Sequence, residues 1–194
     1  MLPNLSPRSL PGIPNLEAVA KIIKKIATEE ILTRYNRLKS HEVSDKASGE
    51  IVTAADVQSE YRLVEELTSL MPDSTVVGEE GFNIDKSIMA RFDGDVPVWI
   101  LDPLDGTTNY LNGLPIFACF IGIVHKGTMV AGALYIPWPN QDGGFVLHCH
   151  RGGGSFADGE RVAVYQSDQP VGNKLVGLPG SFGQLMRFGR GIKG

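Results

Sequence analysis

The sequence predicts an α+β fold in which two helices lie on one face of a sheet. Apolar side chains recur every three or four residues in segments 15–38 and 53–71, as on one face of a helix. From residue 74 onward they come instead in short β-branched runs between turn residues, which is typical of strands. Because two helices precede a run of consecutive strands, we expect an antiparallel sheet layered against those helices.

The first helix is predicted from the spacing of Leu16, Val19, Ile23 and Ile26. Its lysines lie mostly off this stripe, so we expect a surface helix with one buried face. The polar stretch that follows, residues 41–51, is typical of a loop or an exposed hairpin.

The second helix is expected to begin at Thr53. Thr53 and Asp56 have the spacing of a capping box, with Asp in place of the usual Glu. Leu63 and Leu67 continue the apolar face, and Pro72 ends the helix.

Strand-like runs fill the middle of the chain. They are residues 74–80, 96–102, 116–127, 128–138 and 143–150, and a further hairpin is expected around Asp158-Gly159. The first two runs end in acidic residues, so the ends of these two predicted strands are candidate functional positions.

Composition and charge narrow the functional class. The 194 residues are 42% hydrophobic and 21% charged, as in ordinary globular proteins, and the formal net charge is -4. That charge gives no electrostatic reason to expect nucleic acid or an anionic membrane as a partner. No apolar run is long enough to span a bilayer. The two cysteines, Cys119 and Cys149, fit a reducing compartment, so a cytoplasmic location is expected.

Three segments are expected along the chain. Residues 1–14 hold four prolines and are predicted to be a flexible leader. Residues 15–170 form the predicted α+β domain. Residues 171–194 contain a strand-like stretch, KLVGLPG, without a convincing terminal element after it, so they are expected to begin a second domain that this chain does not complete.

The stretch WILDPLDGTTNY, residues 99–110, holds more polar chemistry than a turn needs. A sharp turn needs one aspartate and one glycine, yet Asp102 and Asp105 are both present. A strand end could aim their carboxylates and the Leu104 carbonyl at one point, and Mg²⁺ prefers such oxygen ligands. The alternative is that both aspartates are ordinary turn and strand-end residues.

A candidate phosphate site follows directly. Gly106 permits close approach of the backbone to a ligand, and residues 107–109 are predicted to start a short helix. The free N–H groups at a helix start suit a phosphate. A metal site and a phosphate site would then be neighbours.

Two further acidic clusters are ambiguous by themselves. Glu79-Glu80 is either a solvated turn or a source of metal ligands, and Asp56 is an ordinary acid of a first helical turn. Lys46 could reach a substrate or ion, although a solvated loop lysine is the simpler interpretation. Three acidic clusters at the ends of regular elements, taken together, make chance a weaker explanation.

This series of motifs resembles the inositol monophosphatase family of magnesium-dependent phosphatases. It comprises VTAAD at 52–56, VGEEGF at 77–82, WILDPLDGTTNYLNGLP at 99–115 and GGGSFADGERV at 152–162. The motifs follow in the family's order, and the central one is highly specific. The resemblance implies a layered α/β sandwich whose N-terminal antiparallel sheet packs on two helices, with the second sheet domain largely missing from this chain.

The resemblance also implies a metal site. Glu79, Asp102, Asp105 and the Leu104 carbonyl would ligate Mg²⁺, with Glu80 nearby. Metals about 3.5–4 Å apart can lower the pKa of a water and shield the entering and leaving oxygens of an in-line displacement.

Catalysis and substrate binding are implied for overlapping residues. Asp56 and Thr107 would form a hydrogen-bonded pair that activates the attacking water, with Glu79 as a further catalytic residue. Backbone N–H groups of Gly106 and Thr107 would hold the phosphate. The implied substrate-binding set is Asp102, Leu104, Asp105, Gly106, Thr107 and Thr108.

The implied function is Mg²⁺-dependent hydrolysis of a small phosphate monoester, with inositol 1-phosphate as the first expectation. Fructose-1,6-bisphosphate, histidinol phosphate and a 3'-phosphonucleotide are alternative substrates within the superfamily.

The family's later Trp-Asp motif is not found, because Trp99 belongs to the first motif and Trp138 precedes Pro139. The rival hypothesis is therefore an inactive chain that only binds Mg²⁺ or dimerises. For the full-length protein the resemblance implies a homodimer.

Overall fold

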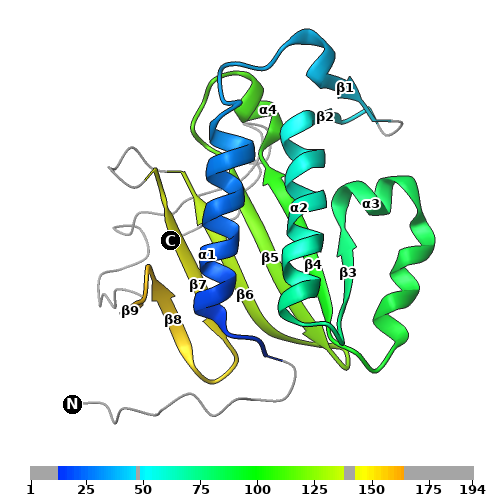
Figure 1. Ribbon diagram of the computed structural model, residues 1–194, viewed down its shortest axis with the longest axis vertical. Helices are drawn as coiled ribbons and strands as arrows, with labels where there is room; N and C mark the ends of the chain where they lie inside the picture. Colours follow the sequence, from blue (N-terminus) through cyan, green and yellow to red (C-terminus); the bar gives the residue numbers. More distant parts are fainter. Residues whose placement is uncertain (1–12, 47–48, 138–142, 164–194) are drawn as a thin grey trace, which may run out of the picture. The chain divides into compact units, whose positions relative to one another are not determined.

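The computed structural model describes residues 13–46, 49–137 and 143–163. All helices and strands of these segments lie within the unit Met1–Val162 (Figure 1). Most of the predicted leader, residues 1–12, and the predicted second-domain segment, residues 171–194, lie outside the described residues.

The first helix, α1, spans Leu16–Ile26. Asn15 caps it, because its side chain accepts hydrogen bonds from the backbone N–H groups of the first turn, at 3.0 and 3.2 Å. The predicted apolar stripe is confirmed, since its four residues are all buried. The helix continues as a wider π-helical segment, η1, over Ala27–Leu32.

The second long helix, α2, spans Ala54–Leu70, and its predicted capping box is confirmed. The Thr53 hydroxyl accepts from the Ala55 N–H at 3.1 Å, and the Asp56 carboxylate accepts from the Thr53 N–H at 2.8 Å. Before it, β1 (Val43–Asp45) and β2 (Ile51–Thr53) form the exposed hairpin that was one of the two expectations for this segment.

Among the described residues, the main sheet has seven strands, which follow one another in chain order. They are β3 (Thr75–Gly78), β4 (Val98–Asp105), β5 (Ala118–His125), β6 (Thr128–Ile136), β7 (Phe145–His150), β8 (Gly154–Ala157) and β9 (Glu160–Val162). Every neighbouring pair from β4 to β9 is antiparallel, as predicted.

The first pair of strands departs from the prediction, because β3 and β4 are parallel. The chain between them forms α3 (Glu79–Ile84) and the 3₁₀ segment η3 (Lys86–Asp93). These two segments bring the chain back to the end of the sheet at which β3 starts, so β4 runs in the same direction as β3. The expectation of a wholly antiparallel sheet is therefore wrong at this pair. Parallel pairing needs such a crossover connection, and it brings both strand ends out at the same edge.

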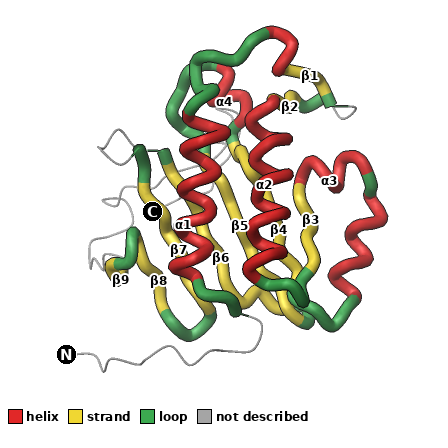
Figure 2. Tube along the Cα trace, in the orientation of Figure 1, coloured by secondary structure: helices red, strands yellow, loops and turns green. Residues whose placement is uncertain are grey.

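Helices α1 and α2 lie side by side across one face of the sheet (Figures 1 and 2). Helix α1 packs on β6 and β7, and α2 packs on β4 and β3. Fully buried side chains between the layers include Ile23, Leu63, Leu67 and Trp99. Each such side chain contributes about 1.5–3 kcal/mol to folding. The predicted α+β architecture is confirmed, and none of the described helices combines the length and apolar character needed to cross a bilayer.

Candidate metal and phosphate site

The parallel pairing of β3 and β4 brings two predicted acidic clusters together. Gly78, the last residue of β3, lies opposite Leu101 of β4. Glu79, the first residue after β3, and Asp102, which lies within β4 and pairs with Phe120 of β5, therefore come next to each other. The pairing of β4 with β5 is interrupted between Asp102 and Asp105. That irregularity frees the backbone of the motif from the regular sheet.

Asp102 is a partly buried acid whose charge its neighbours do not compensate. Its Oδ1 atom is buried and has no hydrogen-bond partner. Burial raises the pKa of Asp102 to about 7, reinforced by the charge of Glu79, a side-chain hydrogen bond with Glu79 and the charge of Asp105. A buried carboxylate oxygen without a partner is costly unless a cation or a proton compensates it. The donor set around Asp102, which consists of oxygen atoms, fits a hard divalent cation.

Lys46 brings a positive charge to the two glutamates that follow β3. Its Nζ donates to Glu79 Oε1 at 2.6 Å and to Glu80 Oε1 at 2.8 Å, and its side chain is only 7% exposed. Burial alone would lower the pKa of Lys46, but the two carboxylates raise it above its usual value, so the ammonium stays charged. The expectation of a solvated loop lysine is therefore wrong, because the β1–β2 hairpin carries Lys46 down onto the start of α3.

Asp56 and Thr107 form the predicted pair. The Thr107 hydroxyl lies 3.2 Å from Asp56 Oδ1 and 2.9 Å from the Leu104 carbonyl oxygen, and it has one proton to share between them. Asp56 is 2% exposed, and burial raises its pKa. Hydrogen bonds from Thr53 and Thr107 partly offset that effect.

The turn that follows the aspartates needs glycine. Gly106 has a φ of 90° and precedes helix α4, Thr107–Leu111. A Cβ atom there would lie 2.9 Å from the Ile116 carbonyl oxygen. The lack of a side chain lets the chain turn tightly, and it leaves the first N–H groups of α4 uncovered by a cap side chain.

One predicted metal ligand and the predicted phosphate-binding turn line the same cavity, which has a volume of about 430 Å³. Glu79 lines it from α3, and Gly106, Thr107 and Thr108 line it from the start of α4. Its other lining residues are Gly49, Glu50, Ile51 and Asn109. The structure therefore places a predicted metal ligand and the predicted phosphate-binding turn on the same cavity, whereas Asp102, Leu104 and Asp105 are not among its lining residues.

The acids do not converge fully. Within residues 13–46, 49–137 and 143–163, no three Asp, Glu, His or Cys side chains come close enough together to hold one metal ion. Lys46 accounts for part of this, because it holds Glu79 and Glu80 by their carboxylates. The Leu104 carbonyl, predicted as a metal ligand, accepts the Thr107 hydroxyl in this arrangement and keeps a second lone pair.

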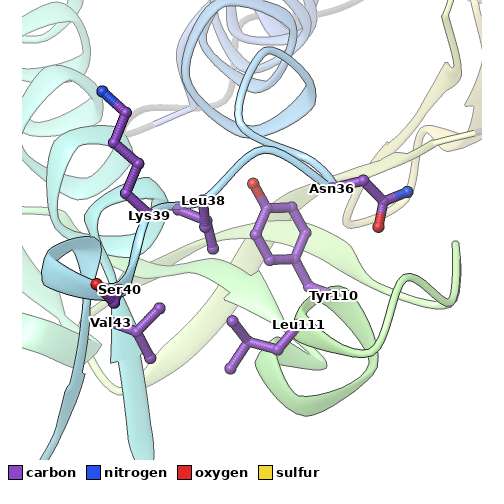
Figure 3. Close-up of a pocket in the computed structure, with 7 residues that line it drawn as sticks. All are labelled: Asn36, Leu38, Lys39, Ser40, Val43, Tyr110 and Leu111. Carbon is purple, nitrogen blue, oxygen red and sulfur yellow. The ribbon is translucent and has the colours of Figure 1, made fainter.

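A second pocket, of about 330 Å³, is lined in part by Tyr110 and Leu111, the last two residues of α4. Figure 3 shows Tyr110 and Leu111 of α4 facing residues of the segment between η1 and β1. Its lining residues are Asn36, Leu38, Lys39, Ser40, Val43, Tyr110 and Leu111. Because this lining contains no carboxylate, the pocket is unsuited to a hard cation and is separate from the predicted site.

Sequence reasoning missed Glu60 entirely. This residue of α2 is buried, and its carboxylate accepts the backbone N–H groups of Glu80 and Gly81 at 2.8 and 2.7 Å. Its burial could have been predicted from the sequence, because Glu60 follows Asp56 by four residues and precedes Leu63 by three. That spacing places it on the buried face of the helix.

The fold and the site together define a class of protein. A layered α+β domain has a carboxylate cluster at two parallel strand ends, beside a glycine turn that starts a helix. This is an arrangement suited to metal-assisted chemistry on a phosphate group. Comparison with known proteins gives the family: residues 14–182 match the inositol monophosphatase family, and the chain belongs to it.

Individual relatives agree with this assignment. A fructose-1,6-bisphosphatase/inositol-1-monophosphatase of Aquifex aeolicus is 31% identical over 150 residues, which cover 77% of this chain and 53% of that protein. An inositol monophosphatase of Dictyostelium discoideum is 30% identical over 149 residues, covering 77% and 51%. The solved structure of a Thermotoga maritima IMPase superimposes with a TM-score of 0.63 at 29% identity, covering 78% and 54%. The chain therefore spans about half the length of the curated relatives it matches.

Proposed function

We propose that this site hydrolyses the phosphate monoester of a small molecule with the help of Mg²⁺. The observation that carries the proposal is the buried, unpartnered Oδ1 of Asp102, which lies beside the charges of Glu79 and Asp105. These three acids and the Leu104 carbonyl would hold the metal. A metal bound there would lower the pKa of a coordinated water and screen the negative charge of the phosphate.

Asp56 and Thr107 would activate the attacking water. With its own proton directed to Asp56 Oδ1, the Thr107 hydroxyl has lone pairs free to accept a hydrogen bond from a water. The water's proton would pass to Thr107 as the Thr107 proton passes to Asp56. The raised pKa of the buried Asp56 favours its acting as the final proton acceptor.

The phosphate would be held by the turn at Gly106. Backbone N–H groups of Gly106 and Thr107, at the start of α4, would donate to the phosphate, and Thr108 lines the same cavity. No covalent intermediate is needed in this scheme, because the nucleophile is water.

Inositol 1-phosphate is the substrate that we propose first. Its support is the family itself and a relative whose name is inositol monophosphatase. Fructose-1,6-bisphosphate is the second candidate, because the Aquifex relative carries both names.

We also propose a cytoplasmic location, with which two free cysteines agree, and a homodimer for the full-length protein. Light scattering on the purified protein measures the oligomeric state.

An inactive chain is the rival function. It is favoured by one observation, namely that no three candidate ligands converge among the described residues. A chain of this kind would keep the fold and bind phosphate or Mg²⁺ weakly without turnover.

A phosphate-release assay separates these proposals. Inositol 1-phosphate and fructose-1,6-bisphosphate are each offered to the 194-residue protein with Mg²⁺ or with EDTA. We expect Mg²⁺-dependent release that is lost in Asp102→Asn and kept in Asp73→Asn, a matched change at an exposed acid. Release that persists in EDTA or in Asp102→Asn would contradict the metal assignment. No release from either substrate would favour the inactive chain.

A further inference from the structure

Helix α2 carries two buried acids one turn apart, Asp56 and Glu60. Asp56 belongs to the proposed water-activating pair. Glu60 takes no part in the chemistry described above, yet its side chain points at the other half of the site. Both of its carboxylate oxygens are used there: Oε2 accepts the Glu80 N–H at 2.8 Å and Oε1 accepts the Gly81 N–H at 2.7 Å.

These two hydrogen bonds replace a cap that α3 lacks. The N-cap residue of α3 is Gly78, which has no side chain to accept the first N–H groups of the helix. A Cβ atom on Gly78 would lie 2.4 Å from the carboxylate carbon of Glu60. Glycine at position 78 therefore leaves the room that Glu60 fills, and the cap comes from Glu60, which lies 20 positions before Glu80 in the chain.

The capped turn is the one that presents the acids of the metal site. Glu79 and Glu80 are the first two residues of α3, so their side-chain directions follow the backbone that Glu60 holds. We propose that Glu60 is a positioning residue: its carboxylate fixes the turn after β3 and so aims Glu79 at the place beside Asp102 where the metal would bind. The consequence for metal binding rests on the proposed function.

A simpler explanation is that Glu60 only adds negative charge near a cation site. The two explanations differ in one variant. Glu60→Asp keeps the charge but shortens the side chain by one methylene, so it cannot reach both N–H groups. Glu60→Gln keeps the length but loses the charge and turns one acceptor into a donor. Positioning predicts that both variants weaken metal binding, whereas charge alone predicts that only Gln does.

The experiment combines a Mg²⁺ titration by calorimetry with amide hydrogen exchange at Glu80 and Gly81. The controls are Glu66→Asp and Glu66→Gln, which change an exposed acid of the same helix that pairs with Lys25. We expect Mg²⁺ affinity to fall about 10- to 100-fold in both Glu60 variants, as it does for residues that orient a metal ligand without binding the metal themselves. Both amides should be protected in the unaltered protein and exchange at least about tenfold faster in both Glu60 variants. The Glu66 variants should stay within about twofold of the unaltered protein in both readouts.

The outcomes separate this proposal from the proposed function. If the unaltered protein binds no Mg²⁺, the proposed function fails, and the exchange data still decide whether Glu60 holds the turn. Unprotected amides at Glu80 and Gly81 in the unaltered protein would overturn the positioning role, even if the Glu60 variants did not fold. A Glu60→Asp protein with unchanged exchange and unchanged Mg²⁺ affinity would overturn it as well.

Discussion

The Thr107 hydroxyl lies 3.2 Å from the Asp56 carboxylate, although 51 residues separate the two in the chain. Asp56 is held at the start of α2 by its capping box, and Thr107 is held at the start of α4 by the turn at Gly106. Two helix starts therefore meet at one point. The hydrogen bond between them is the structural basis for the proposed activation of water.

Replacing Thr107 by valine tests that pair. Thr107→Val keeps the shape of the side chain but removes the hydroxyl that lies between Asp56 and the Leu104 carbonyl. We expect phosphate release to fall about 10²- to 10⁴-fold, the range for loss of general acid–base assistance, with the fold retained. Thr33→Val, at an exposed hydroxyl that bonds its own helix, should leave turnover unchanged. Equal turnover in Thr107→Val and the unaltered protein would remove Thr107 from the mechanism.

Lys46 is expected to compete with the metal for Glu79. Its ammonium lies 2.6 Å from Glu79 Oε1 and 2.8 Å from Glu80 Oε1. We expect Lys46→Gln to raise Mg²⁺ affinity roughly five- to tenfold, because the cation that neutralises these carboxylates is gone. The melting temperature in EDTA should fall at the same time. Lys21→Gln, on α1, is the control, and weaker Mg²⁺ binding in Lys46→Gln would show that the lysine supports the metal rather than displaces it.

Gly106 should be far less tolerant of a side chain than a glycine in an open turn. Gly106→Ala combines a φ of 90° with a Cβ placed 2.9 Å from a carbonyl oxygen. Gly127→Ala has a φ of 68° but no heavy atom within 4 Å of the new Cβ. We expect Gly127→Ala to lose about 1 kcal/mol of unfolding free energy, from the conformational cost alone. We expect Gly106→Ala to lose at least about 2 kcal/mol, because the close contact of the new Cβ adds to that cost. Equal losses in urea titrations would show that the close approach at Gly106 carries no cost.

The two ion pairs of Glu30, a residue of η1, should make stability depend on pH. Glu30 accepts hydrogen bonds from Arg34 and Arg62, each at 2.6 Å. Burial alone would raise the pKa of Glu30, but the two guanidinium groups lower it below its usual value. The folded state therefore favours the carboxylate, so its contribution is full at neutral pH and is lost as pH falls through the lowered pKa.

Glu30→Gln measures this contribution. We expect it to lower the unfolding free energy by about 0.5–1 kcal/mol at pH 7, because the pairs are only partly buried. The difference from the unaltered protein should shrink when urea titrations are repeated at successively lower pH, because Glu30 is protonated first in the unfolded state and then, as pH falls through the lowered pKa, in the folded state. Glu65→Gln, at an exposed acid, is the control. A difference that stays constant with pH would mean that the loss is one of packing and not of charge.

Local patterns made much of the fold and part of the site predictable. The apolar stripe of α1, the capping box at Thr53 and the strands from β4 to β9 depend on neighbours in sequence. The short helix after Gly106 was predicted for the same reason, because a glycine turn and a run of hydroxyl residues specify it locally.

The pairings made across the chain could not be predicted in the same way. The parallel register of β3 with β4 follows from the path of a connecting segment, which has no strong pattern of its own. Lys46 looked solvated because its neighbours are polar, and only the folded hairpin shows its contact with Glu79, 33 residues away. Glu60 is placed by the same kind of long-range contact.

The most direct test of the central claim is a calorimetric titration of the protein with Mg²⁺, in parallel with Asp102→Asn and Asp73→Asn. The claim is that Asp102, whose buried Oδ1 has no hydrogen-bond partner, is the centre of a divalent-cation site. The account predicts saturable Mg²⁺ binding in the unaltered protein and in Asp73→Asn, with affinity reduced at least about tenfold in Asp102→Asn. No binding to the unaltered protein, or equal binding to Asp102→Asn, would contradict it.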